Sequence, residues 1–176
     1  MNIRFKLTLI ICCCLLSCKS STCKKENHQE QSSLLKDHKT VVLVNSQHNH
    51  WLLEQYGYQK WEPSEQEITI AQDILSTAIK DGIFDFLKKP VKESFHEYYK
   101  QYIPYLTKEG ENVIEINAFC EILELPPAPR STSTQWTTMD WKKEYVMVDD
   151  GGNCYWQITV SITKKTYKNL QVNGEG

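Results

Sequence analysis

Two histidines in the first third of the chain are the first candidates for chemistry. His48 and His50 stand two positions apart, directly before Trp51. If this segment is a strand, side chains at i and i+2 share a face, and the two imidazoles are then close enough to bind one metal ion. A zinc site needs three or four protein ligands, and the sequence offers no identifiable carboxylate or thiol partner for this pair. We therefore predict no metal site and no cofactor.

Cys120 and Cys154 are the two thiols best placed to react with each other. Both fall on the predicted core face of neighbouring strands. In an oxidising compartment they are candidates for a disulfide, and two buried thiols are the alternative. A catalytic cysteine needs a histidine close by, and His96 is the only histidine in the predicted helix-and-sheet region. The sequence therefore predicts no catalytic residues.

Acidic residues form two further patterns, and neither fits the geometry of a known site. Glu115 and Glu121 share one predicted strand, where six residues span roughly 20 Å. That separation is too large for the paired carboxylates of a glycosidase. The segment 149–153 carries two aspartates and an asparagine, but an EF-hand loop needs a glutamate at its twelfth position, which is Val160 here. A plain turn is the prediction for 149–153.

Aromatic side chains are the remaining candidates for contact with a ligand or a partner. Tyr102 and Tyr105 belong to a tyrosine-rich segment that is suited to lining a groove, and cross-strand packing is their alternative role. Trp136 falls in a long loop that contains three prolines. We predict these three residues as contacts for an unknown protein or small-molecule partner.

The start of the chain carries the most specific signal. Arg4 and Lys6 precede an apolar run that is too short to cross a bilayer core of roughly 30 Å. The run ends in Leu15-Leu16-Ser17-Cys18. This segment resembles the lipobox of bacterial lipoproteins, and the resemblance implies that Cys18 becomes an acylated N-terminus. Several acyl chains, such as palmitate, bind a membrane in a way that is effectively permanent.

This resemblance divides the chain into three parts. Residues 1–17 form the predicted signal peptide, 18–40 a polar and flexible tether, and 41–176 a single domain. Without Arg4 and Lys6 the chain carries 18 basic and 22 acidic residues, a net charge of −4. A basic stripe is lacking, so we predict no nucleic-acid partner. The expected location is the bacterial cell envelope, where the lipid attaches the protein to a membrane on its periplasmic or outer-membrane side.

One amphipathic helix is predicted over residues 64–80. Ser64 is a suitable N-cap, and Glu67, three residues later, completes a capping box. Asp81 and Gly82 mark its end, and Pro90 stops any continuation. Between these two ends, apolar side chains recur at helical spacing, at Ile68, Ala71, Leu75, Ala78 and Ile79.

Four strands are predicted after this helix. The first two are 98–107 and 112–123, the second of which alternates cleanly between apolar and polar residues. The last two are 141–149 and 153–163, joined by the glycine-containing turn into a hairpin. Before the helix, the apolar run Val41–Val44 is predicted as a strand or as a segment laid against the core.

The predicted fold class is α+β, with one N-terminal amphipathic helix packed on a four-stranded antiparallel sheet. This order of elements is similar to that of cystatin-like folds. The mature region also resembles small uncharacterised lipoproteins of Bacteroidetes-type bacteria, a family that implies no activity. The residues that carry this second resemblance are Gly110–Glu111, Ile116–Cys120, Asp149–Tyr155 and Val172–Glu175.

Two functions of different classes are consistent with these features. The first is a lipid-anchored binding or assembly module, because a tethered domain without a catalytic pattern suits contact with a partner. The second is a periplasmic enzyme with a polar pocket between helix and sheet, in which His96 acts with Glu93 or Glu97. An open, polar space between helix and sheet favours the enzyme or a ligand-binding protein, and a filled one favours a protein-facing surface.

Overall fold

A five-stranded mixed sheet organises the described part of the chain. The computed structural model describes residues 37–88, 90–130 and 132–174, so Cys18 lies outside the described residues. The strand order is β1-β2-β3-β6-β7, in which β1 is parallel to β2 and all other neighbours are antiparallel. The bounds are Thr40–Val42 for β1, Tyr99–Leu106 for β2, Asn112–Phe119 for β3, Tyr155–Ser161 for β6 and Thr166–Val172 for β7.

Three α-helices accompany this sheet. They are α2 (Gln47–Tyr56), α3 (Glu65–Lys80) and α4 (Val91–Glu97). The capping box that was predicted for α3 is confirmed, since Ser64 accepts from the Glu67 backbone N–H and the Glu67 carboxylate accepts from the Ser64 N–H. No helix among the described residues has both the length and the apolar character needed to cross a membrane.

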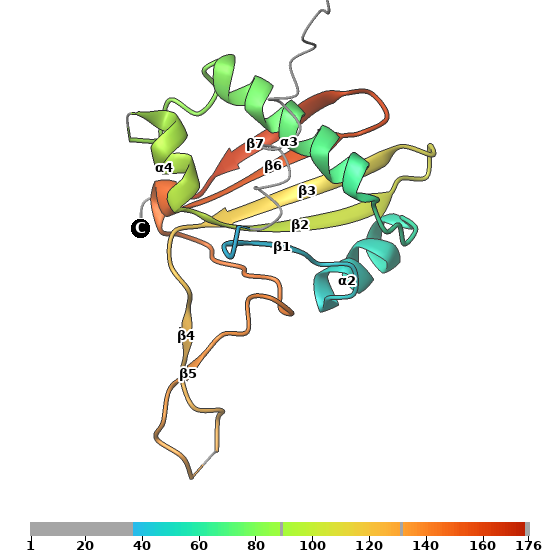
Figure 1. Ribbon diagram of the computed structural model, residues 1–176. Helices are drawn as coiled ribbons and strands as arrows, with labels where there is room; N and C mark the ends of the chain where they lie inside the picture. The colour runs from blue at the N-terminus through green and yellow to red at the C-terminus, as the bar shows by residue number, and fades with distance from the viewer. Residues whose placement is uncertain (1–36, 89, 131, 175–176) are drawn as a thin grey trace, which may run out of the picture.

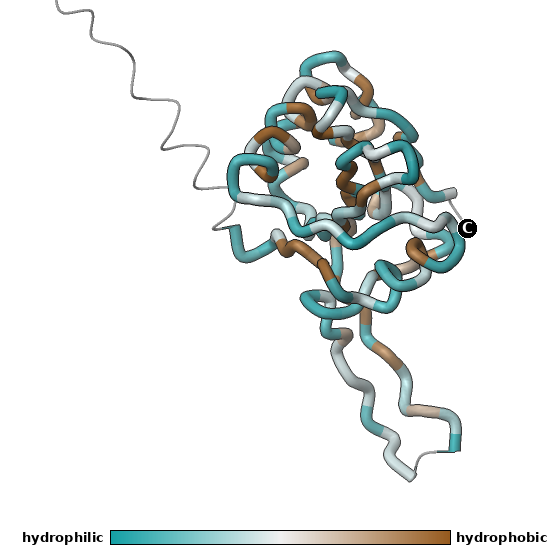
Figure 2. Tube along the Cα trace, turned by 90° about the vertical axis from the view of Figure 1, so that its right-hand side faces the viewer, coloured by the Kyte–Doolittle hydropathy of each residue, from teal (hydrophilic) through white to brown (hydrophobic). Residues whose placement is uncertain are grey.

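The two faces of the sheet are covered differently. Figure 1 shows α3 lying across one face, while α2 lies beside the opposite face. The segment 139–150 also packs on that opposite face, through Trp141 and Val146. In Figure 2 the apolar stretches gather within the body of the molecule, and the long excursion below it is mainly hydrophilic or neutral.

The predicted fold class holds only at the level of an α+β protein with a helix packed on a sheet. The prediction of one N-terminal helix on a four-stranded antiparallel sheet is wrong. The sheet has five strands, and its first strand, β1, is parallel to β2. Helix α2 precedes α3, and a helix of this kind was not predicted. It begins at a capping box in which Asn49 takes the position usual for glutamate, and it ends at Gly57 in a left-handed conformation.

The predicted strand 141–149 is also wrong, and with it the hairpin to 153–163. Residues 141–143 form a turn, and the Lys143 and Glu144 N–H groups both donate to the Asp140 carbonyl at 2.9 Å. The turn 149–153 leads into a 3-10 helix, Gly152–Cys154, and Gly151 and Gly152 both have positive φ. The hairpin partner of β6 is β7, an exposed strand on the edge of the sheet.

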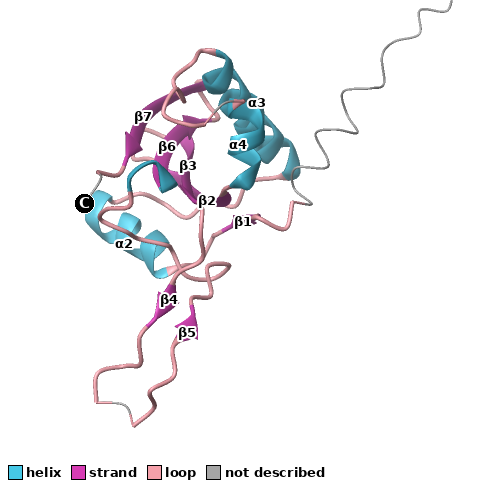
Figure 3. Cartoon of the chain, turned by 90° about the vertical axis from the view of Figure 1, so that its left-hand side faces the viewer, coloured by secondary structure: helices cyan, strands magenta, loops and turns pink. Residues whose placement is uncertain are grey.

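A narrow two-stranded ribbon leaves the body between β3 and β6. Its strands are β4 (Glu124–Leu125) and β5 (Thr137–Thr138), paired antiparallel with Leu125 opposite Thr137. Residues 121–130 and 132–139 together are called the arm. Figures 1 and 3, seen from directions 90° apart, both show the arm running away from the sheet and its helices.

Candidate functional site

Apolar side chains fill the interface between α3 and the sheet. Trp156 is 1% exposed in this layer, beside the fully buried Ala71 and Ile116. The rings of Phe84 and Phe95 pack on the indole of Trp156, with centroids 5.0 and 5.6 Å away. The layer directly beneath α3 is therefore filled in the described residues, and the open space beside this helix is a groove toward β7 that is described below.

The residues predicted to serve such a pocket lie on the surface instead. His96 is exposed on α4, where its ring makes an edge contact with Phe95 at 6.3 Å. Glu93 and Glu97 are exposed on the same short helix. None of these three side chains lines the open groove beside α3.

The three predicted contact aromatics have different environments. Tyr102 is 2% exposed and belongs to the core under α3, while Tyr105 is 8% exposed on the opposite face and stacks on Tyr58 at 4.7 Å. Burial raises the pKa of both phenols. Both tyrosines pack within the protein, which is the alternative role considered for them, and their contact with a ligand or partner stays a prediction. Trp136, in contrast, is 57% exposed on the arm.

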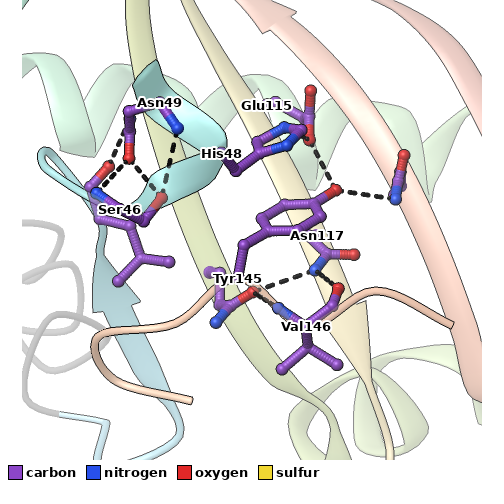
Figure 4. A network of polar contacts seen from close by, with 10 residues as sticks. Ser46, His48, Asn49, Glu115, Asn117, Tyr145 and Val146 are labelled. Carbon is purple, nitrogen blue, oxygen red and sulfur yellow. Dashed lines mark hydrogen bonds and ion pairs between the residues drawn. The ribbon is translucent and has the colours of Figure 1, made fainter. Parts of the chain in front are cut away.

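A polar network fixes the segment 141–146 to the second face of the sheet (Figure 4). Gln101 on β2 and Asn117 on β3 are directly opposite each other. The Gln101 amide nitrogen donates to the carbonyls of Trp141 and Glu144 at 2.6 and 2.7 Å, and its oxygen accepts from the Val146 N–H at 3.0 Å. Asn117 donates to the Gln101 oxygen and to the Val146 carbonyl. Two amide side chains thus replace the backbone partners that a strand would have supplied.

Tyr145 is the centre of a second polar group next to that network. Its hydroxyl donates to Glu115 at 2.9 Å and accepts from the Gln157 amide at 2.9 Å. Burial raises the pKa of the Tyr145 phenol, and the neighbouring Glu115 carboxylate raises it further. The His48 ring stacks on Tyr145 with centroids 3.8 Å apart, and its Nε2 lies 3.3 Å from the Glu115 carboxylate without the alignment of a hydrogen bond. This group attaches α2 to the sheet.

The helical conformation of α2 separates the two histidines considered as metal ligands. Residues two apart on an α-helix point about 200° apart around its axis. His48 is accordingly packed against Tyr145, and His50 is exposed. Within the described residues, no group of three or more His, Cys, Asp or Glu side chains is arranged to hold a metal ion.

An exposed row of aromatic rings continues outward from His48. Trp51 lies 5.4 Å from His48, and Tyr56 meets Trp51 edge-on at 5.4 Å with an interplanar angle of 86°. Tyr58 stacks on Tyr56 at 5.3 Å and joins the row to the buried Tyr105. Trp51 and Tyr56 are 44% and 46% exposed. We call Trp51, Tyr56 and Tyr58 the aromatic strip; the sequence pattern did not reveal it, because α2 itself was missed.

The arm is the second exposed surface with large apolar side chains. Trp136 and Leu125 are 57% and 38% exposed, and they lie one residue apart along the paired strands, since Leu125 is opposite Thr137. Among the described residues 126–136, only Pro127 is even partly shielded from solvent. A body that buried its apolar side chains elsewhere leaves these available for contact with another molecule.

A disulfide between Cys120 and Cys154 closes the base of the arm. The bond joins the end of β3 to the start of β6, with the two Cα atoms 5.1 Å apart. This is one of the two states considered for these thiols. Cys120 is exposed and Cys154 half-buried, so the expectation that both lie on the core face is wrong.

An open groove runs between α3 and the turn end of β7. It encloses about 700 Å³ and is lined by residues of both elements, among them Ile70, Thr77 and Lys165. The Tyr167 hydroxyl donates to the Asp81 carboxylate across it at 2.8 Å. The groove is open to solvent and its lining is partly polar, so it is the kind of space that the enzymatic alternative called for, but His96, Glu93 and Glu97 do not belong to its lining.

Lys100 is a buried cation at the start of β2. Its ammonium donates to the Tyr98 carbonyl at 2.7 Å, lies 3.6 Å from the Asp37 carboxylate, and sits over the Phe95 ring. Burial lowers the pKa of Lys100 to about 8, although the Asp37 carboxylate acts in the opposite direction. The charged form is therefore less favourable in the folded protein than in the unfolded chain.

We expect this lysine to make stability increase between pH 8 and pH 10. In that range the unfolded chain holds the Lys100 proton while the folded protein releases it, so the free energy of unfolding rises with pH by at most about 1.4 kcal/mol per unit. Above pH 10, ionisation of unfolded tyrosines reverses the trend, because burial raises the pKa of Tyr102 in the folded state. Urea unfolding at several pH values measures the slope. Lys100→Met should remove the rise and the exposed Lys60→Met should keep it; equal slopes in both variants would contradict the assignment.

Comparisons with known proteins do not add to this geometry. Neither the protein-family models, nor the curated proteins, nor the solved structures contain a match to the chain. The account of function therefore depends on the surfaces described above.

Proposed function

We propose that the protein is a lipid-anchored component of the bacterial cell envelope that acts as a binding or assembly module, with the arm as its contact surface. The observation that carries the proposal is the contrast between the filled interface under α3 and the exposed arm. Trp156 is buried within that interface, whereas Trp136 is exposed on a ribbon that projects from the body. A protein whose main helix packs on the sheet through a filled apolar layer, and which presents Leu125 and Trp136 on a ribbon fixed at its base by a disulfide, is suited to contact a macromolecule.

The predicted tether and the disulfide both support this proposal, the first through the reach of the domain and the second through the fixed base of the arm. The tether predicted over residues 18–40 would give a root-mean-square reach of roughly 25 Å from the membrane, which lets the domain meet partners near the surface. Its last residue is a correction to that prediction, because β1 begins at Thr40. The Cys120–Cys154 bond fixes the base of the arm and so limits the entropy lost when the arm is bound. The proposed partner is a protein; the acyl chains on Cys18 provide the membrane contact.

The anchor is tested by Cys18→Ser in the full chain. We expect the wild-type protein to sediment with membranes and to incorporate labelled palmitate, and the variant to lose both properties. Cys23→Ser, in the same predicted tether, is the matched control and should behave like the wild type. Membrane retention of the Cys18 variant would contradict lipid anchoring.

The contact surface is tested by shortening the arm. Leu125 and Thr137 are directly opposite each other in the ribbon, so residues 126–136 can be replaced by the two-residue turn Asn-Gly. This turn joins antiparallel strands in that register and keeps the pairing of β4 with β5. We expect the wild type to give a high-mass species on native gels of solubilised membranes, and this variant to keep the wild-type melting temperature but to lose that species. Met147→Ala, at an exposed apolar residue outside the arm, should keep that species. Persistence of the complex without the arm would contradict the proposal.

We also propose that the likeness to cystatin-like folds applies in a revised form. Helix α3 is followed along the chain by β2, β3, β6 and β7, which are consecutive antiparallel neighbours. The additional elements are β1 and α2, before α3, together with the short α4 and the arm. An experimental structure in which β6 pairs with a strand from 141–149 would contradict this version.

A further inference from the structure

The proline-rich part of the arm has a backbone conformation that its sequence largely determines. Residues 125–129 read Leu-Pro-Pro-Ala-Pro. The three proline rings fix φ near −65°, and each residue before a proline is confined to the extended or polyproline II region. All five positions are restricted by one of these effects or by both. Residues 125–128 therefore favour extended or polyproline II conformations before they meet a partner, and Pro129 and Arg130 then form a turn.

This segment cannot act as an added β-strand. Residues 126–129 offer one backbone N–H, at Ala128, because proline has none. Strand addition depends on regular main-chain hydrogen bonds, so that mode of recognition is excluded for these residues. A preformed polyproline II segment is instead recognised by grooves lined with aromatic side chains, which contact its rings. The arm therefore calls for a receptor with exposed aromatic residues.

The aromatic strip on α2 has the properties of such a receptor. Trp51 and Tyr56 are each nearly half exposed, and their perpendicular rings present a face next to an edge. Glu54 lies three residues after Trp51 on the same helix and is also exposed. Arg130, the only arginine outside the predicted signal peptide, directly follows the prolines and is exposed. The two surfaces are therefore complementary, because the aromatic rings of the strip suit the proline rings of the arm, and Glu54 has the charge opposite to that of Arg130.

We propose that the proline segment of one molecule docks on the aromatic strip of a second copy of this chain. The inference rests on the proposed function and names its partner. Pro126, Pro127 and Pro129 pack against Trp51 and Tyr56, and Arg130 faces Glu54. The arm of each molecule points away from its own body, which presents its prolines outward (Figures 1 and 3).

The contact joins two different surfaces and is therefore heterologous. Such contacts repeat from one molecule to the next, and they form rings or chains unless the geometry closes. The docked area is small, so the affinity in dilute solution is low. Anchoring of many copies to one membrane raises their effective concentration and makes the contact effective there.

The test is photo-crosslinking of the full chain in its native membrane. A photoreactive amino acid at Gln55, an exposed position one turn after Trp51, should give an adduct of twice the protein's mass whose mapped site lies on the arm. Changing the three prolines to serine, or Trp51 and Tyr56 to alanine, should reduce this adduct about tenfold or more, the equivalent of 1.4 kcal/mol. Ala128→Pro keeps the backbone conformation and should leave the adduct at the wild-type level. Melting temperatures close to that of the wild type establish that the variants fold.

A mixing experiment separates a heterologous contact from general disruption. The proline variant retains an intact strip, and the strip variant retains an intact arm. Co-expressed with different tags, they should restore an adduct between the two tags, although each alone gives little. A self-adduct that is insensitive to the prolines, or a mixture that stays uncrosslinked, would overturn the inference. If the Gln55 probe gives no self-adduct but the arm-shortened variant loses its high-mass species, the partner is a different protein and only the proposed function stands. If the self-adduct survives the proline changes and the high-mass species survives shortening of the arm, both the inference and the proposed function are overturned.

Discussion

Gln101→Leu is expected to destabilise the protein by about 3–5 kcal/mol. The Gln101 amide makes three hydrogen bonds to the segment 141–146 and accepts a fourth from Asn117, so the substitution leaves the Val146 N–H and the Trp141 and Glu144 carbonyls without their partner. Each buried polar group left unpaired costs about 1–3 kcal/mol, and partial rearrangement limits the total. Urea unfolding measured by tryptophan fluorescence gives the difference in the free energy of unfolding.

Gln157→Leu is the matched control for this prediction. Gln157 lies on the same face of the sheet, but its amide donates one hydrogen bond, to the Tyr145 hydroxyl. The expected cost is about 1 kcal/mol. Equal destabilisation by the two substitutions would mean that the segment 141–146 does not depend on Gln101 for its attachment.

Loss of the Cys120–Cys154 disulfide is also expected to lower the free energy of unfolding strongly. The bond closes a loop between residues 34 apart in sequence, and a link across a loop of that length stabilises a folded protein by about 3–4 kcal/mol through its restriction of the unfolded chain. Cys120→Ser combined with Cys154→Ser should lower the free energy of unfolding by this amount. The same loss should follow when the wild type is reduced.

Reduction of the double variant provides the control. A reducing agent should leave its unfolding midpoint unchanged, since Cys120 and Cys154 are the cysteines that the structure joins. A wild-type midpoint that does not respond to reduction would contradict a stabilising role for the bond. Local proteolysis of the arm should also accelerate after reduction, because its base then loses its covalent link and keeps only non-covalent contacts, such as the hydrogen bond from the Cys120 N–H to the Cys154 carbonyl and that from the Tyr155 hydroxyl to Glu121.

The parts of the fold that could be predicted are those with a strong local pattern. The capping box at Ser64 and the apolar spacing behind it located α3 to within a residue. The alternation along 112–119 located β3, because one face of that strand is buried under α3 and the pattern of period two reflects it. The exposed position of Trp136 followed from the prolines around it, which are unsuited to a central strand.

The parts that could not be predicted depend on contacts between distant residues. The segment 141–149 was predicted as a strand, but the side chains of Gln101 and Asn117 satisfy its backbone and the strand is not formed. Strand β7 is exposed on the edge of the sheet, so no alternation marks it. Helix α2 is short and mixed in composition, and its attachment through His48 and Tyr145 joins residues almost a hundred positions apart.

The central claim is that the arm, and not a pocket in the body, carries the function. A photoreactive amino acid in place of Trp136, in the full chain in its native membrane, tests it most directly. The account predicts a discrete protein adduct from position 136 and none from position 147, which is also exposed but lies outside the arm. Adducts with lipid alone, or equal labelling from the two positions, would contradict it.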